Sequence, residues 1–385
     1  MVENCALGYK ETETYMTKEK IKGFVKGNAV MLIAFVCACV TAIIVPPDKE
    51  YLGYFDLKTL SCLFCVLAVV CALKNIRFFY TMAKAIVRKF KNTRSAILAL
   101  VYITFIGSML IANDMALLTF LPLGYFVLHT TEKEKYMAFA FIMQNIAANL
   151  GGMLTPFGNP QNLYLYSKFN IPDLEFMSIM LPPFILSITL ITACCFLFVK
   201  PEEFEIKERA AALPIPRVII YLILFAISIL IVFRAVPYQV GLVIIPVALL
   251  FLDRQALLDV DWGLLFTFVF FFIFSGNMAR IEPVREFFSY LLELDTLVFS
   301  AASCQFISNV PSAILLSSFT DNYRELLLGV NIGGVGTLIS SLASLITFRE
   351  YGKDQPRHTL SYVLKFSAFN FAFLVILVTF CALLR

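Results

Sequence analysis

The chain has 385 residues, of which 60% are hydrophobic and 15% are charged, and its formal net charge at pH 7 is +4. This composition lies outside the range of soluble globular domains and predicts an integral membrane protein. The positive charge is small and spread along the chain, which excludes a basic face for nucleic acid, so no nucleic-acid partner is expected.

The chain starts with a charged tail, residues 1–26, and continues with apolar runs. A helix needs about 20 apolar residues to cross a bilayer. Runs near this length lie at 27–45, 56–73, 174–199, 217–234, 237–252, 263–279 and 359–384. Three further apolar regions, 95–128, 135–167 and 295–348, carry amides, glycines and prolines in their middles. We expect the function to reside in these interrupted regions.

Lysines and arginines in the short loops set the orientation, because cytoplasmic loops are enriched in them. The tail 1–26 and the segment 74–94 are rich in basic residues, whereas the loop 46–55 carries a single lysine beside two acids. The N-terminus is therefore expected to be cytoplasmic, in the plasma or inner membrane. Residues 76–90 alternate aromatic and basic faces, which favours a helix lying on the inner membrane surface.

A charged, proline-rich stretch, residues 200–216, is predicted to be a cytoplasmic linker between two halves of the chain. The first half, 27–199, contains a span, a hairpin near 95–128 and a broken helix at 135–167. The second half, 217–385, contains a hairpin near 295–320, a broken helix at 324–348 and the final span.

The two halves carry matching segments. NLGGMLTPFGNPQNL (149–163) aligns with NIGGVGTLISSLASL (331–345), and IANDMALLTFLP (111–122) aligns with ISNVPSAILLSS (307–318). The order of the segments is the same in both halves, but the predicted direction through the membrane is reversed. This pattern is typical of an inverted-topology repeat.

The glycine pairs and prolines at 149–163 and 331–345 predict interrupted helices. Unpaired peptide groups are costly in hydrocarbon, so a broken helix persists only where it is buried in protein or lines a polar cavity. A kinked helix whose glycines allow close packing is the alternative. Two matched breaks favour a binding site, in which freed N–H groups hold an anion and freed carbonyls hold a cation. The candidate residues at the breaks are Asn149, Gly151, Gly152, Thr155, Pro156, Gly158, Asn159, Asn162, Asn331, Gly333, Gly334, Thr337, Ser340 and Ser341.

The matched segments at 111–122 and 307–318 are predicted to be the tips of re-entrant hairpins that enter from opposite sides. Asp114 is the acid within the apolar core of the first half. A carboxylate inside the membrane is costly and is a candidate for ion coupling, although capping of the following helix is an alternative role. The candidate residues at the tips are Asn113, Asp114, Ser308, Asn309, Val310, Pro311 and Ser312.

The segments IANDMALLTFLPLG and NIAANLGGMLTPFGNPQNLYLY resemble the ion transporter superfamily, which holds arsenite, citrate, sodium/dicarboxylate and sodium/proton permeases, and most closely its anion permease branch. The resemblance implies an all-α polytopic fold of about eleven transmembrane segments with two re-entrant hairpins. It also implies a scaffold domain, a transport domain that moves like an elevator, and a homodimer. In the dicarboxylate members the tips read Ser-Asn-Thr. Here Val310 replaces the threonine, which leaves dicarboxylate specificity and sodium coupling open.

The expected function is secondary active transport of a small anion, an organic carboxylate or an inorganic oxyanion, by sodium- or proton-coupled symport. A sodium/proton antiporter and an arsenite-type efflux permease are the alternatives. The sequence contains no P-loop, metal-ligand cluster or nucleophile arrangement, so neither an enzyme nor a resident cofactor is expected. The one metal expected is sodium, near Asn113, Asp114 and Gly151.

Overall fold

The computed structural model describes residues 28–203 and 212–385, and in these ranges the chain is helical. In the first range the helices are α2 (Ala29–Ile44), η1 (Lys49–Tyr54), α3 (Leu57–Asn75), α4 (Phe78–Val87), α5 (Thr93–Ile111), α6 (Asn113–Thr130), η2 (Glu134–Tyr136), α7 (Met137–Gly151), η3 (Gly152–Leu154), α8 (Pro160–Lys168) and α9 (Asp173–Phe198). In the second range they are α10 (Ile215–Val232), α11 (Tyr238–Leu252), α12 (Arg254–Leu258), α13 (Trp262–Arg280), α14 (Glu282–Ile307), α15 (Asn309–Leu316), α16 (Tyr323–Ile332), α17 (Leu342–Asp354), η4 (Pro356–His358) and α18 (Thr359–Leu383).

The described residues contain 8 helical segments that are long and apolar enough to cross a membrane. The apolar helices α2 and α11 are shorter, with 16 and 15 residues. The expected surface helix at 76–90 is α4, which has 10 residues. The tail 1–26 and the middle of the linker 200–216 lie outside the described residues.

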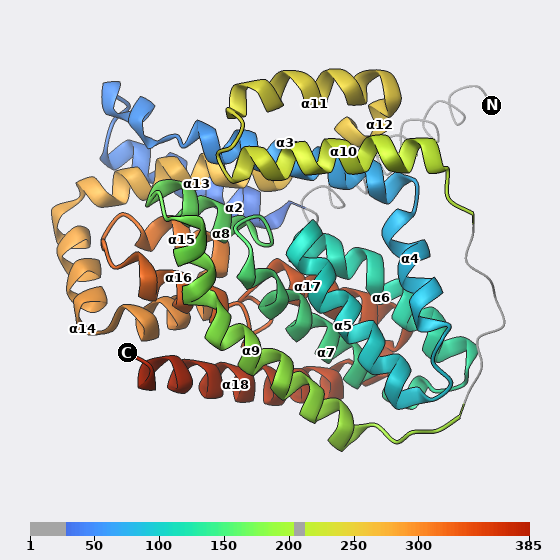
Figure 1. Ribbon diagram of the computed structural model, residues 1–385. Coiled ribbons are helices and arrows are strands. Elements are labelled where there is room, and N and C mark those ends of the chain that lie inside the picture. Colours follow the sequence, from blue (N-terminus) through green and yellow to red (C-terminus); the bar gives the residue numbers. More distant parts are fainter. Residues whose placement is uncertain (1–27, 204–211) are drawn as a thin grey trace, which may run out of the picture.

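The helices are arranged as two outer layers with a packed centre between them (Figure 1). Helices α10 and α11 pack against α3 along one side, and α9 packs against α18 along the opposite side. Large apolar side chains on α10 and α11 are exposed: Ile223 by 56%, Val243 by 63% and Phe251 by 83%. An exposed apolar face of this kind suits contact with lipid.

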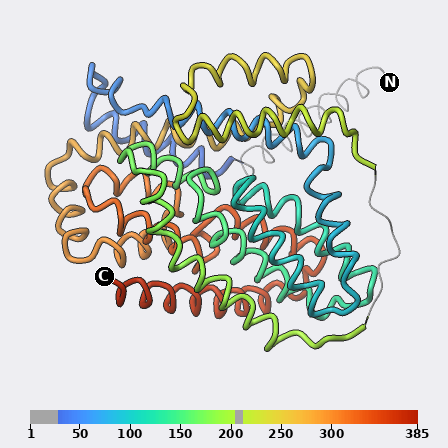
Figure 2. The backbone as a smooth tube through the Cα atoms, in the orientation of Figure 1, coloured from blue at the N-terminus to red at the C-terminus, as the bar shows by residue number. Residues whose placement is uncertain are grey.

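The centre of the molecule is built from both halves of the chain. In Figure 2 the orange and red segments run among the green and cyan ones. Helix α17 packs against α6 and α7, and α15 packs against α8. Helix α2 packs along α13, which brings the start of the first half next to the second.

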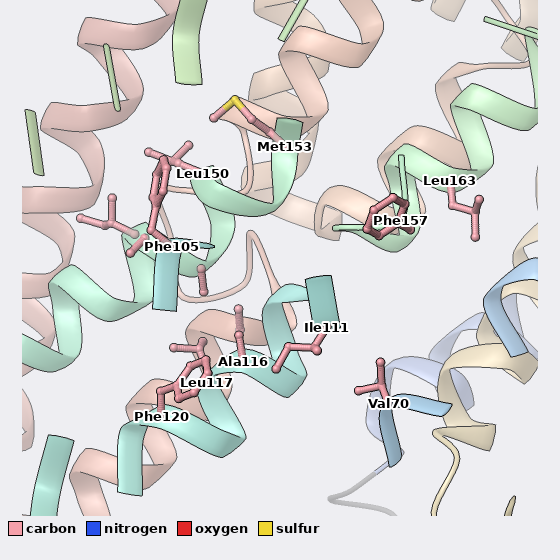
Figure 3. Close-up of a cluster of buried hydrophobic side chains, with 14 of the residues drawn as sticks. Val70, Phe105, Ile111, Ala116, Leu117, Phe120, Leu150, Met153, Phe157 and Leu163 are labelled. Carbon is pink, nitrogen blue, oxygen red and sulfur yellow. The ribbon is translucent and has the colours of Figure 1, made fainter. Parts of the chain in front are cut away.

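The hairpin of α5 and α6 is held by an apolar core that also includes the broken helix of the first half. Figure 3 shows Phe105 of α5 beside Leu150 of α7, with Leu117 and Phe120 on α6 nearby. Gly107 makes the close approach within the hairpin possible, because a Cβ there would lie 2.5 Å from the Phe120 ring. The core therefore fixes the hairpin and the break relative to each other.

Candidate functional site

A tight turn joins two helices within each of the matched segments at 111–122 and 307–318. Ala112 joins α5 to α6 with φ 63° and ψ 153°, and Ser308 joins α14 to α15 with φ 74° and ψ 158°. Residues other than glycine adopt such angles rarely, and they cluster at functional sites where the surroundings enforce them. In both turns the next asparagine accepts a hydrogen bond from the backbone that follows, with Oδ1 of Asn113 3.0 Å from the Asp114 N and Oδ1 of Asn309 2.9 Å from the Val310 N. The two tips thus share one local geometry.

The chain also leaves the helical conformation within the two glycine-rich segments at 149–163 and 331–345. Between α7 and α8 the chain passes through η3, an extended Thr155 and a turn at 156–158, and α8 starts at Pro160 after an extended Asn159. Between α16 and α17 the chain leaves the helix at Gly333, and α17 starts at Leu342 after an extended Ser341. Ser341 caps α17 by accepting a hydrogen bond from the Ser344 N at 3.1 Å.

Each break is tied to the hairpin of its own half by a threonine. The Thr155 hydroxyl donates to the Met109 carbonyl at 2.8 Å, and the Thr337 hydroxyl donates to the Gln305 carbonyl at 3.0 Å. Met109 and Gln305 each precede their turn residue by three positions. The same contact therefore recurs in both halves.

The first glycine of each pair packs against the first helix of the hairpin in its own half, which is α5 or α14. A Cβ on Gly151 would lie 2.2 Å from the Phe105 carbonyl and 2.7 Å from the Ser108 hydroxyl. A Cβ on Gly333 would lie 2.8 Å from the Cys304 sulfur and 2.9 Å from the Ala301 Cα. Any larger residue would separate the break from its hairpin. These glycines therefore serve close packing, and they do so at matched positions.

Buried asparagine amides join the tips and the breaks. Nδ2 of Asn113 donates to Oδ1 of Asn149 at 3.1 Å, which links the first tip to the first break. Nδ2 of Asn331 donates to Oδ1 of Asn162 at 2.6 Å, and Nδ2 of Asn159 donates to Oδ1 of Asn331 at 3.3 Å. The second break is thus hydrogen-bonded directly to the first.

The tips and the second half-helices of both breaks meet at a cavity of about 100 Å³. Its wall is completed by the starts of α2 and α13. The residues that line it are Asn28, Ala29, Val30, Met31, Asn113, Asp114, Pro160, Gln161, Asp261, Gly263, Leu264, Thr267, Ser308, Asn309, Val310, Pro311, Leu342, Leu345 and Arg349.

The N-termini of six helices, α2, α6, α8, α13, α15 and α17, meet at this cavity. A helix N-terminus carries a partial positive charge equivalent to about half an elementary charge, and N–H groups that are not already bonded can contact a ligand. Some are bonded here, since the N–H groups of Asp114, Val310 and Leu264 donate to side-chain oxygens. Two carboxylates lie in the same wall. Asp261 caps α13 through a 2.8 Å hydrogen bond from the Leu264 N. The wall therefore combines positive helix ends, these two carboxylates and the guanidinium group of Arg349.

Two oxygen atoms in the cavity wall are buried and have no hydrogen-bond partner among the described residues. They are Oδ1 of Asp114 and Oε1 of Gln161. Asp114 does not cap α6 with its side chain, since Asn113 supplies that contact, so the capping alternative for Asp114 is not realised here. Buried polar atoms are nearly always paired, and unpaired ones at a cavity are typical of groups that bind a ligand.

The predicted site residues fall into two groups. Those that line the cavity are Asn113, Asp114, Ser308, Asn309, Val310 and Pro311. Those that lie outside its lining are Asn149, Gly151, Gly152, Thr155, Pro156, Gly158, Asn159, Asn162, Ser312, Asn331, Gly333, Gly334, Thr337, Ser340 and Ser341. Members of the second group hold the tips and half-helices in place through hydrogen bonds, as Asn149, Thr155 and Thr337 do. The wall formed by α2 and α13 was not predicted, because Asn28 and Asp261 look like ordinary residues at the start of a span.

Comparison of the sequence with models of known protein families gives a match. A model of the citrate transporter family matches residues 17–323. The chain belongs to the citrate transporter family. Together with the apolar helices, this membership makes the protein a multi-pass membrane transporter.

Curated relatives agree with the family. An uncharacterized transporter of Methanocaldococcus jannaschii is 32% identical over 301 residues, which cover 78% of this chain and 82% of the relative. The inner membrane protein YbiR of Escherichia coli is 28% identical over 313 residues, with the same two shares covered. A silicon efflux transporter of Oryza sativa subsp. japonica is 28% identical over 156 residues, 40% of this chain and 30% of the relative.

Proposed function

We propose that this protein is a secondary active transporter that moves a small anion, an organic carboxylate or an inorganic oxyanion, coupled to sodium or protons. The observation that carries the proposal is the convergence of six helix N-termini and both hairpin tips on one cavity. Neutral N–H donors hold an anion without neutralising it, which allows release as well as capture.

The matched contacts of the two halves support an inverted-topology repeat. Both turns have positive φ. Both threonines donate to the carbonyl three residues before the turn, and the first glycine of each pair packs on the first helix of the hairpin. The predicted direction of the halves is opposite. Such repeats give two alternative arrangements around one site, which is the basis of alternating access.

We further propose that the wall formed by α2 and α13 belongs to a scaffold and that the tips and breaks belong to a transport domain. The cavity lies between these groups, so an elevator-type motion would carry the site past α2 and α13. In this proposal the protein is a homodimer in the plasma or inner membrane with a cytoplasmic N-terminus. Distances between spin labels on α2 and α17, measured with and without substrate, test the motion.

Reconstituted protein tests the transport function directly. Proteoliposomes are assayed for uptake of labelled citrate, succinate, sulfate and arsenite under an imposed sodium or proton gradient. We expect one anion to accumulate under one gradient and to leak out when an ionophore collapses it. Asn309→Leu at the second tip is expected to lower uptake about 10-fold, because it leaves the Val310 N without its partner.

The control for this assay is Phe251→Leu on the exposed face of α11, which is expected to leave uptake unchanged. Absence of gradient-driven movement of any of these solutes, in either direction, would refute the proposal. Sodium-driven proton movement without solute uptake would instead identify a sodium/proton antiporter.

An arsenite-type efflux permease is the second candidate. The unpaired oxygens of Asp114 and Gln161 are hydrogen-bond acceptors, and they suit a neutral oxyacid that donates from its hydroxyl groups. The silicon efflux transporter among the relatives supports the same candidate. Loss of arsenite or silicic acid from preloaded vesicles, without uptake of carboxylates, would favour it.

A further inference from the structure

Side-chain amides occupy the centres of both helix breaks. A break in a membrane helix releases backbone carbonyls that need donors or cations, since hydrocarbon offers neither. In transporters with broken helices, such freed carbonyls are the usual ligands of the coupling cation. The question for this chain is what the carbonyls of each break contact.

At the first break the partner is Asn162, which is fully buried. Its Nδ2 lies 3.1 Å from the Gly152 carbonyl, 3.2 Å from the Met153 carbonyl and 3.2 Å from the Thr155 carbonyl. Its Oδ1 accepts the hydrogen bond from Asn331. Only this orientation of the amide is compatible with its neighbours, because the reverse would set its oxygen against three carbonyl oxygens.

At the second break the partner is Gln305 of the hairpin. Its Nε2 lies 2.9 Å from the Gly333 carbonyl and 3.2 Å from the Val335 carbonyl, and its Oε1 accepts from the Thr337 N at 2.8 Å. Gly336 adopts φ +131°, and a Cβ there would lie 2.1 Å from Oε1. The backbone of the break is therefore shaped to receive the glutamine.

We propose that the amides of Asn162 and Gln305 take the places of cations at the two breaks, so that both breaks keep their shape without bound sodium. An amide NH₂ directs partial positive charge at several carbonyls, as a cation does. Unlike a cation, it is covalently fixed and cannot be released on the other side of the membrane.

The inference rests on the proposed transport function, and it narrows the choice of coupling site. Sodium that entered either break would have to displace an amide whose other end is already hydrogen-bonded. Any coupling ion is then expected to act away from the carbonyls that these amides contact. Asp114 is the ionisable side chain at the hairpin tips.

The test measures sodium-dependent stability of the purified full-length protein. The melting temperature is recorded in sodium chloride and in choline chloride at equal ionic strength. We expect any difference between the two salts in the wild-type protein to disappear in Asp114→Asn, because sodium does not bind at the breaks. Asn162→Asp places a carboxylate against three carbonyls and should create a sodium site, which raises the melting temperature in sodium by roughly 3 °C or more near saturation.

Asn370→Asp is the matched control, because Asn370 is equally buried but its Nδ2 contacts a single carbonyl, that of Phe366, at 2.8 Å. We expect it to lower the melting temperature in both salts alike. If Asn162→Asp does not fold, Gln305→Glu provides the same test at the second break.

Saturable stabilisation by sodium over choline that persists in Asp114→Asn would overturn the inference. Failure of sodium to stabilise both Asn162→Asp and Gln305→Glu would overturn it as well. The uptake assay separates this failure from failure of the proposed function. If sodium stabilises Asp114→Asn while the wild type accumulates an anion, the proposed function stands and the inference fails. If the wild type transports nothing while sodium stabilises the acidic variants, the inference stands and the proposed function fails.

Discussion

The hydrogen bonds of Asn331 give a prediction whose magnitude follows from the structure. Asn331→Leu removes the bonds to Asn162 at 2.6 Å and to Asn159 at 3.3 Å, and it leaves both amides short of a partner in a buried place. Each unsatisfied buried polar group costs about 1–3 kcal/mol, so we expect a loss of about 2–6 kcal/mol in the free energy of unfolding. Denaturant unfolding of the detergent-solubilised protein measures it.

A double-mutant cycle tests whether this loss arises from the contact itself. Asn162→Leu combined with Asn331→Leu should cost less than the sum of the single changes, with an interaction energy of about 0.5–3 kcal/mol. Asn277→Leu on α13 is the control, since Asn277 is buried and bonded to Thr41 of α2 instead. Its effect should add to that of Asn331→Leu. Additivity of the first pair within about 0.5 kcal/mol would refute the reasoning.

Three further predictions concern other parts of the molecule. Asp114→Asn should leave the protein folded but flatten the dependence of uptake on the driving ion, as measured in proteoliposomes; unchanged ion dependence would remove Asp114 from the coupling site. Gly336→Ala should cost about 1–3 kcal/mol in unfolding experiments, because its Cβ would meet Gln305 at a positive φ, whereas Gly53→Ala, with no atom within 4 Å, should change stability by less than about 0.5 kcal/mol. Hydrogen bonds from two lysines and a tyrosine lower the pKa of Glu202 from 4.5 to about 2. The stability advantage of the wild type over Glu202→Gln should therefore be full above about pH 4.5 and fade as the pH falls toward 2; an advantage that persists below pH 2 would contradict this.

The positions of both turns and both breaks were predictable, because polar or flexible residues inside apolar runs have a local cause. Asn113 interrupts a run that is otherwise long enough for a tilted span, and the helix ends two residues before it, at Ile111. The glycine pairs mark the breaks for the same reason. Comparison of the two halves then identified the matched places without any knowledge of contacts.

The partners of the polar side chains were not predictable from the sequence. Gln305 lies inside a helix in the sequence pattern, and its role depends on Gly333 and Val335, which are far along the chain. Asn162 was predicted only as a candidate binding residue, and nothing in the sequence indicated that its Nδ2 would face the carbonyls of its own break. Spacing along the chain tells which residues are polar, whereas the fold decides which atoms meet.

The bonds that Asn331 makes to Asn159 and Asn162 have a consequence for the timing of release. Because the interrupted helices of the two halves are fastened to one another at buried atoms, neither can tilt or unwind by itself without stranding an amide. The contacts that the two interrupted helices make with a bound solute would therefore be lost together, in one concerted step.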